Sequence, residues 1–102
     1  MRHDLTSNFS ASLDEVLSST PAQLVENPAH AARLVVEGSL EDPSKAAHIA
    51  DKISNAYNAI PTAKKRKQAI GLLRFALARE MQTAQHAAPQ RWAQVQKKLG
   101  GF

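Results

Sequence analysis

The chain of 102 residues contains no cysteine. This absence excludes disulfide frameworks, cysteine-ligated zinc or iron–sulfur sites and thiol nucleophiles together. Only four glycines are present, and β-branched residues are too few to supply a substantial sheet. Long apolar runs are also missing: the longest mainly apolar stretch, residues 69–78, is interrupted by Arg74. That stretch is about half as long as a membrane-spanning helix needs to be, so no transmembrane segment is predicted.

Acidic residues are scarce in the second half of the chain. Residues 1–51 carry three basic and eight acidic side chains, whereas residues 52–102 carry ten basic side chains and one acidic side chain, Glu80. The net charge of +4 therefore conceals a strong asymmetry. Such asymmetry favours a polyanionic partner, an acidic protein surface or an anionic membrane. The alternative is that the two halves pack together and neutralise part of each other's field.

The prolines mark the starts of helices. Pro21, Pro28 and Pro43 each follow a Thr, Asn or Asp, and proline at the first helical position after such a capping residue is a typical helix start. Gly38 is expected to end one helix in the left-handed conformation. The predicted helices cover residues 13–19, 21–26, 28–37, 43–59, 62–86 and 89–100.

These features predict an all-α fold, a compact bundle of four to six helices. Alanine, the residue with the highest helix propensity, is the commonest in the chain. We expect a loose N-terminal segment at residues 1–11 and a single helical domain at residues 12–100. A long amphipathic helix near residues 62–86 is expected at the centre of the bundle. Its predicted buried arc consists of Ala69, Ile70, Leu72, Leu73, Ala76, Leu77 and Met81.

The long helix begins with four consecutive cations, residues 64–67. Cations in the first turns oppose the helix dipole by about 0.3–1 kcal/mol each, so stability alone does not favour them. Free N–H groups, the dipole and this charge together favour a bound anion, with phosphate the obvious occupant. The predicted outer face of this helix carries Lys64, Lys67, Gly71, Arg74 and Ala78, and it is flanked by Gln68, Phe75, Arg79 and Gln82. Gly71 leaves room there for close approach. Similar basic positions recur on the last helix, where Trp92 is expected in the core rather than stacked on a base.

The predicted nucleic-acid-binding residues are Lys64, Lys65, Arg66, Lys67, Arg74, Arg91 and Lys98. The competing interpretation is a solvated basic face that pairs with Glu37, Glu41 or Asp42. No metal site is predicted, because none of the four histidines falls in a metal-binding pattern. No nucleophile elbow, phosphate-binding glycine loop or paired catalytic carboxylates are present. We therefore expect neither an enzyme nor a cofactor.

The sequence predicts a non-enzymatic binding or regulatory module that associates with nucleic-acid phosphates through its basic helix. The alternative is a protein–protein interaction module that uses helical grooves or the acidic N-terminal half: an adaptor, an inhibitor or a secreted bacterial effector. Peripheral membrane binding is the weakest option, because the core needs the apolar arc of the same helix. The first residues lack the apolar stretch of a secretory signal, so a cytoplasmic location is expected. Oligomeric state stays open.

Overall fold

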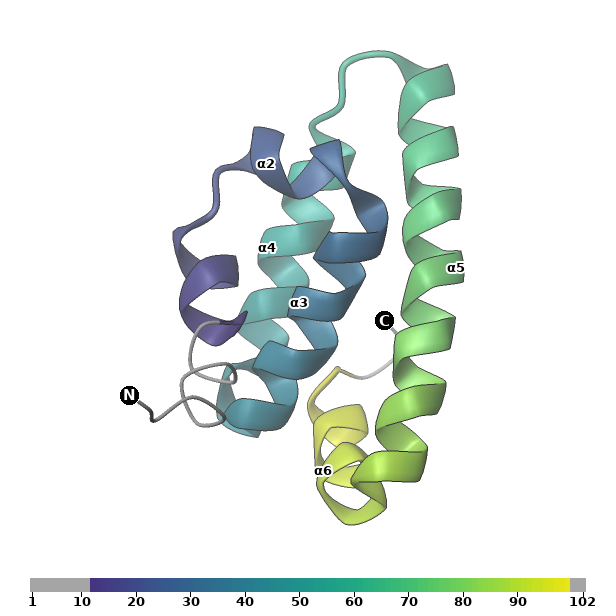
Figure 1. Cartoon of the computed structure of the whole chain (residues 1–102). Coiled ribbons are helices and arrows are strands. Elements are labelled where there is room, and N and C mark those ends of the chain that lie inside the picture. Colours follow the sequence, from purple (N-terminus) through teal and green to yellow (C-terminus); the bar gives the residue numbers. More distant parts are fainter. Residues whose placement is uncertain (1–11, 100–102) are drawn as a thin grey trace, which may run out of the picture.

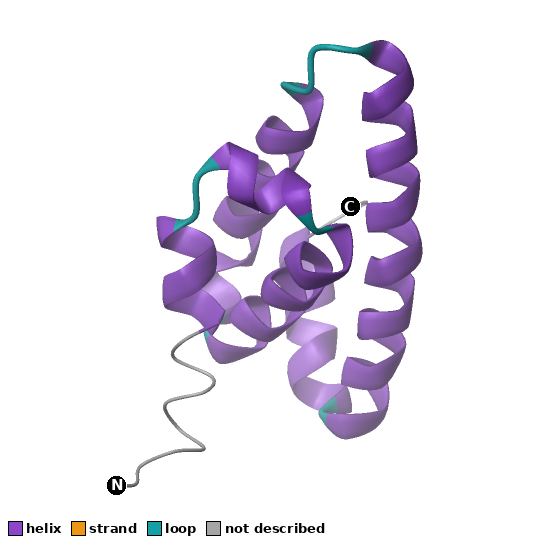
Figure 2. Ribbon diagram, turned by 45° about the horizontal axis from the view of Figure 1, so that its top comes forward, coloured by secondary structure: helices purple, strands orange, loops and turns teal. Residues whose placement is uncertain are grey.

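The computed structural model describes residues 12–99, and every regular element within them is helical. After a helix over residues 12–18 come α2 (Pro21–Glu26), α3 (Pro28–Glu41), the short 3-10 helix η1 (Pro43–Lys45), α4 (Ala46–Asn58), α5 (Ala63–Ala87) and α6 (Pro89–Leu99). Figure 1 and Figure 2 show these helices gathered into one bundle. The all-α prediction is confirmed. The expected loose segment at residues 1–11 and the expected end of the last helix at residue 100 lie outside the described residues.

The predicted helix starts at Pro21 and Pro28 are confirmed by the hydrogen bonds at the helix ends, whereas at Pro43 the 3-10 helix η1 comes first and α4 begins only at Ala46. The Thr20 hydroxyl accepts a bond from the Gln23 N–H (3.2 Å), and the Gln23 side chain accepts one from the Thr20 N–H (2.9 Å). Asn27 caps α3 in the same way, by accepting from the His30 N–H at 3.1 Å. Asp42 caps η1, and the hydrogen bond from the Ser44 hydroxyl lowers the pKa of the Asp42 carboxyl. Local capping therefore defines where α2, α3 and η1 begin.

The prediction that Gly38 ends its helix was wrong, because α3 continues through Gly38 to Glu41. Gly38 is buried at a crossing of helices. A Cβ atom on Gly38 would lie 3.3 Å from Ile49 Cδ1 and 3.5 Å from Val16 Cγ1. The glycine thus allows α4 and the helix over residues 12–18 to approach α3 closely, and it has no role in a left-handed turn.

The central helix of the bundle is α3. It packs against α2, η1, α4, α5 and α6, and half of its residues are buried. The expectation that the long basic helix would be central was wrong, since only Leu73, Leu77 and Ala84 of α5 are buried. Because α5 packs mainly on α3, it covers one side of the core and leaves most of its own surface to solvent.

Helix α5 runs along one side of the molecule, next to α3 and in the same direction (Figure 1). Its 25 residues extend about 38 Å at 1.5 Å per residue, close to the 42 Å length of the whole molecule. Helix α4, which lies between them in the sequence, runs in the opposite direction, and the loop over residues 59–62 joins it to α5. The basic first turns of α5 therefore lie at the opposite end of the long axis from α6.

Two buried aromatic side chains hold the bundle together. Tyr57 of α4 donates a 2.8 Å hydrogen bond to the Leu24 carbonyl of α2. Within a helix that carbonyl would accept from residue 28, but Pro28 has no N–H, so the tyrosine satisfies it instead. Burial raises the pKa of Tyr57 to about 12, which keeps the hydroxyl in its donor form. Trp92 is also buried, as predicted, and anchors α6 in the core together with Val95.

Candidate functional site

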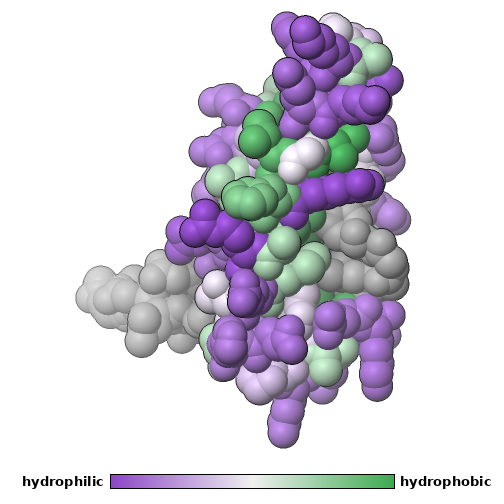
Figure 3. All heavy atoms as spheres, turned by 90° about the vertical axis from the view of Figure 1, so that its right-hand side faces the viewer, coloured by the Kyte–Doolittle hydropathy of each residue, from purple (hydrophilic) through white to green (hydrophobic). Residues whose placement is uncertain are grey.

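The first turns of α5 form a hydrophilic end of the molecule, visible at the top of Figure 3. No acidic residue lies in the first turn, and the Thr62 side chain makes no capping hydrogen bond. Lys64, Lys65 and Lys67 are exposed there. The positive end of the helix dipole and these three ammonium groups therefore coincide, and that combination favours an anion.

Arg66 has a different role from the lysines around it. Its Nη1 donates a 2.7 Å hydrogen bond to the Ile60 carbonyl, and the side chain is half-buried. The guanidinium thereby holds the loop over residues 59–62 against the start of α5. Arg66 therefore stabilises the loop, and its surroundings do not support the predicted contact with nucleic acid.

Two more exposed cations, Arg74 and Arg79, continue the basic surface along α5. Arg74 borders a groove between α4 and α5, which Tyr57 and Leu77 also line. Arg79 lies on the other flank of the helix, toward the start of α3. Within residues 12–99, the following cations of α5 have no ion pair and no side-chain hydrogen bond: Lys64, Lys65, Lys67, Arg74 and Arg79.

The structure separates Arg91 from this group. Arg91 Nε donates to the Leu40 carbonyl and its Nη2 donates to the Glu41 carbonyl at 2.9 Å. These carbonyls belong to the last turn of α3, where no further turn supplies N–H groups, so Arg91 caps that helix. The start of α6 is about 35 Å along α5 from Lys64. Lys98 is exposed on α6, so the seven predicted residues divide into a group on α5 and a group on α6.

The acidic residues proposed to neutralise the basic helix either have other partners or lie far from it. Glu37 accepts from the Ser12 hydroxyl at 2.7 Å and from Arg33 Nε at 2.9 Å. Asp42 caps η1, and Glu41 lies in the last turn of α3, at the far end of the molecule from Lys64. The interpretation that these acids pair with residues 64–67 was therefore wrong, and the field of the α5 cations is not cancelled by them.

Leu72 and Phe75 are the large hydrophobic side chains exposed in the described part of the chain, at 60% and 67%. Leu72 was predicted on the buried arc, and that prediction was wrong. The buried stripe of α5 is narrower than predicted and centres on Leu73, Leu77 and Ala84. Leu72 lies about 100° from Leu73 around the helix axis, beyond the reach of α3. Figure 3 shows the resulting apolar patch on the outer face, next to the hydrophilic end.

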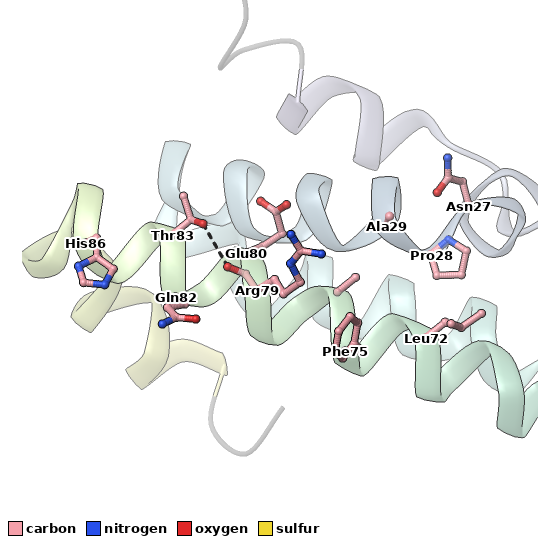
Figure 4. A pocket seen from close by; sticks show the side chains of 11 residues that line it. Asn27, Pro28, Ala29, Leu72, Phe75, Arg79, Glu80, Gln82, Thr83 and His86 are labelled. Atoms are coloured by element: carbon pink, nitrogen blue, oxygen red, sulfur yellow. Dashed lines mark hydrogen bonds between the residues drawn. The ribbon is translucent and has the colours of Figure 1, made fainter.

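An open hollow adjoins this patch, between the start of α3 and the middle of α5. Pro28 and Ala29 face Leu72 and Phe75 across it (Figure 4). Polar side chains line its other end, as Figure 4 shows: Arg79, Glu80, Gln82, Thr83 and His86. The hollow therefore combines an apolar floor with a polar, partly cationic rim.

Neither a metal centre nor a known relative defines the site. Residues 12–99 contain no group of three or more His, Asp or Glu side chains placed to hold a metal ion. None of the helices in this part of the chain combines the length and apolar character needed to cross a bilayer. No protein-family model, curated protein or solved structure matches the chain. The chemistry of the α5 face is therefore the basis for a functional proposal.

Proposed function

We propose that this protein is a non-enzymatic binding module that associates with nucleic-acid phosphates through the outer face of α5. The observation that carries the proposal is the set of exposed α5 cations without acidic partners, which we call the basic face: Lys64, Lys65, Lys67, Arg74 and Arg79. The proposal includes the cytoplasm as the place where the module works.

Stability gives no reason for this charge distribution. Lysines in the first turn of a helix oppose its dipole, by about 0.3–1 kcal/mol each when exposed. Of the acids that could have relieved the repulsion, Glu37 pairs with Arg33 at 2.9 Å and Asp42 caps η1 instead. A surface that costs stability and remains unpaired is better explained by a partner that supplies the negative charge.

The basic face is long enough to follow a phosphate backbone. Lys64 and Arg79 are fifteen residues apart, or about 22 Å along the helix axis. If all five cations contact phosphates, the log–log dependence of affinity on salt has a slope of about −3.5 on single strands and −4.5 on duplexes. Phosphate contacts position a protein without reading bases, so affinity should vary little with sequence.

The experiment compares two double variants that each remove two positive charges. Lys64→Gln/Lys67→Gln removes charge from the basic face, and Lys45→Gln/Lys97→Gln removes exposed charge outside α5. Fluorescence anisotropy with labelled oligonucleotides across a salt series gives the affinities and slopes. We expect the first variant to lose about 1.5 to 2 from the magnitude of the slope, and the second to keep the wild-type slope.

Two outcomes would contradict the proposal. Wild-type protein that binds no oligonucleotide at low salt has no such function, and equal slopes for both variants would show that the binding charge lies outside the basic face. Circular dichroism of both variants controls for folding, since the substituted side chains are exposed and should leave the melting temperature nearly unchanged.

A second candidate function, a protein–protein interaction module, is favoured by one observation. The exposed side chains of Leu72 and Phe75 border the hollow beside α3, and exposed apolar surface of this kind often marks an interface. A mainly apolar interface responds weakly to salt, whereas phosphate binding weakens steeply. The salt series therefore separates the two functions.

A further inference from the structure

The centre of the basic face is occupied by an aromatic ring. Phe75 is 67% exposed, so its ring is available to a partner. Gly71 and Arg79 lie one turn to either side of it, at the i−4 and i+4 positions that are neighbours on a helix surface. An exposed aromatic ring on a cationic surface is an arrangement on which unpaired bases stack.

The surface beside the ring is open. A Cβ atom on Gly71 would meet no atom within 4 Å, so nothing occupies the space one turn before Phe75. Side chains on a helix lean toward its N-terminus, which directs the Phe75 ring toward this space. A flat group can therefore approach the ring without displacing a neighbouring side chain.

Polar side chains that can form hydrogen bonds with a base lie on the same face of α5 as Phe75. Gln68 and Gln82 are exposed, seven residues to either side of Phe75, and their amides can both donate and accept hydrogen bonds. The one acid of α5, Glu80, is half-buried. It lies close enough to α3 for its charge to raise the pKa of Arg33. This face thus offers exposed cations, amides and a ring, and the one carboxylate of α5, Glu80, is half-buried.

We infer that the nucleic acid bound by α5 is single-stranded, with a base stacked on Phe75 and the adjoining phosphates held by Lys64, Lys67 and Arg79. The inference rests on the proposed function and narrows it to one class of nucleic acid. In a duplex the faces of the bases are stacked and only their edges are accessible, so a ring on a convex helix has nothing to stack on. In a single strand every base offers a face, and stacking is tolerant of sequence.

The charges near Phe75 favour a nucleic acid over a protein as the partner that contacts its ring. The five cations of the basic face are exposed on the same helix as Phe75, whereas the one acid of that helix, Glu80, is half-buried. Contact surfaces between proteins are depleted of lysine at their cores. Charge complementarity therefore selects a polyanion that also carries flat apolar groups.

The test measures the affinity of the intact chain for labelled oligothymidylate and for a hairpin duplex of equal length. We expect wild-type protein to bind the single strand more tightly. Phe75→Leu keeps an apolar side chain but removes the ring, and it should weaken single-strand binding by about 5- to 100-fold. The same variant should change duplex affinity and both salt slopes by less than about twofold, because its phosphate contacts are intact.

Leu72→Ala is the matched control, because it truncates the other exposed apolar side chain of the patch. Its single-strand affinity should stay within about twofold of wild type, since Leu72 has no ring to stack. Phe75→Trp supplies a direct signal: its emission should be quenched by oligothymidylate and much less by the duplex. Wild-type protein, whose only tryptophan is the buried Trp92, gives the background.

Each outcome separates this inference from the proposed function. Binding of both nucleic acids with equal affinity, unchanged in Phe75→Leu, overturns the single-strand inference and leaves the proposed function standing. Equal losses in Phe75→Leu and Leu72→Ala also overturn it, because the patch then acts as a general apolar surface, as it would for a protein partner. Absence of all nucleic-acid binding overturns both.

Discussion

Helices α3 and α5 lie side by side, yet they differ in the fraction of their residues that is buried. Of the 14 residues of α3, seven are buried, and the helix packs against five other elements. Of the 25 residues of α5, three are buried, and α3 is its main support. The shorter helix therefore holds the fold together, and the longer one presents a surface.

The charges follow the same division. The α3 residues Arg33 and Glu37 pair with each other at 2.9 Å, and Arg91 caps the end of α3. On α5, by contrast, Lys64 and Arg74 have no ionic partner among residues 12–99. Arg33 and Glu37 of the central helix are therefore paired within the fold, whereas the exposed cations of the peripheral helix remain available to a ligand.

The largest expected effect comes from the same truncation made in both helices. Leu34→Ala in α3 removes a side chain that is 3% exposed, and it should lower the free energy of unfolding by about 2–5 kcal/mol. Leu72→Ala in α5 removes a side chain that is 60% exposed, and the loss should stay within about 0.5 kcal/mol. Urea unfolding measures both. Similar losses would mean that α5 is as deeply packed as α3.

The next effect concerns the arginine that caps α3. Arg91→Gln removes the donors to the Leu40 and Glu41 carbonyls and should cost about 1 kcal/mol. Arg74→Gln removes an equal charge from α5, where no carbonyl depends on it, and should leave stability almost unchanged. Thermal unfolding followed by circular dichroism compares the two. If Arg74→Gln were the more destabilising variant, the division between scaffold and surface cations would be wrong.

A glycine within each helix gives a smaller contrast. Gly71→Ala should stabilise the protein by about 0.5–1 kcal/mol, because the new methyl group meets open space and alanine favours helix. Gly38→Ala should not show this gain, since its Cβ would lie 3.3 Å from Ile49 Cδ1 and the neighbour must move. The order of the two melting temperatures is the measurement. A higher melting temperature for Gly38→Ala would contradict the close packing of α3.

The smallest effect has opposite signs for stability and binding. Lys64→Glu places a carboxylate at the start of α5, where the helix dipole should stabilise it by about 0.3–1 kcal/mol. The same change reverses one charge of the basic face and should weaken oligonucleotide binding at low salt. A melting curve and an anisotropy titration on one preparation check both. Increased stability with unchanged binding would remove Lys64 from the site.

Much of the site followed from the sequence, because helix periodicity alone places side chains on a face. Lys64, Lys67 and Arg74 were predicted on the outside of the long helix, and they are exposed there. Phe75 and Arg79 were placed beside that face without a role. The signal that would have found them is the four-residue spacing of Gly71, Phe75 and Arg79, which puts a ring and a guanidinium on one face of the helix. Both side chains are exposed because the rest of the fold buries only three residues of α5.

The sequence by itself determined the helical class and the helix starts, because capping, proline chemistry and alanine propensity act within a few residues of the chain. Only the tertiary structure decided that α3 is central, that Gly38 is a packing contact and that Leu72 is exposed. It also gave Arg66 and Arg91 backbone partners, the latter some fifty residues away in the chain. Such contacts depend on which helices meet, and a single helix's own pattern of residues does not specify its neighbours.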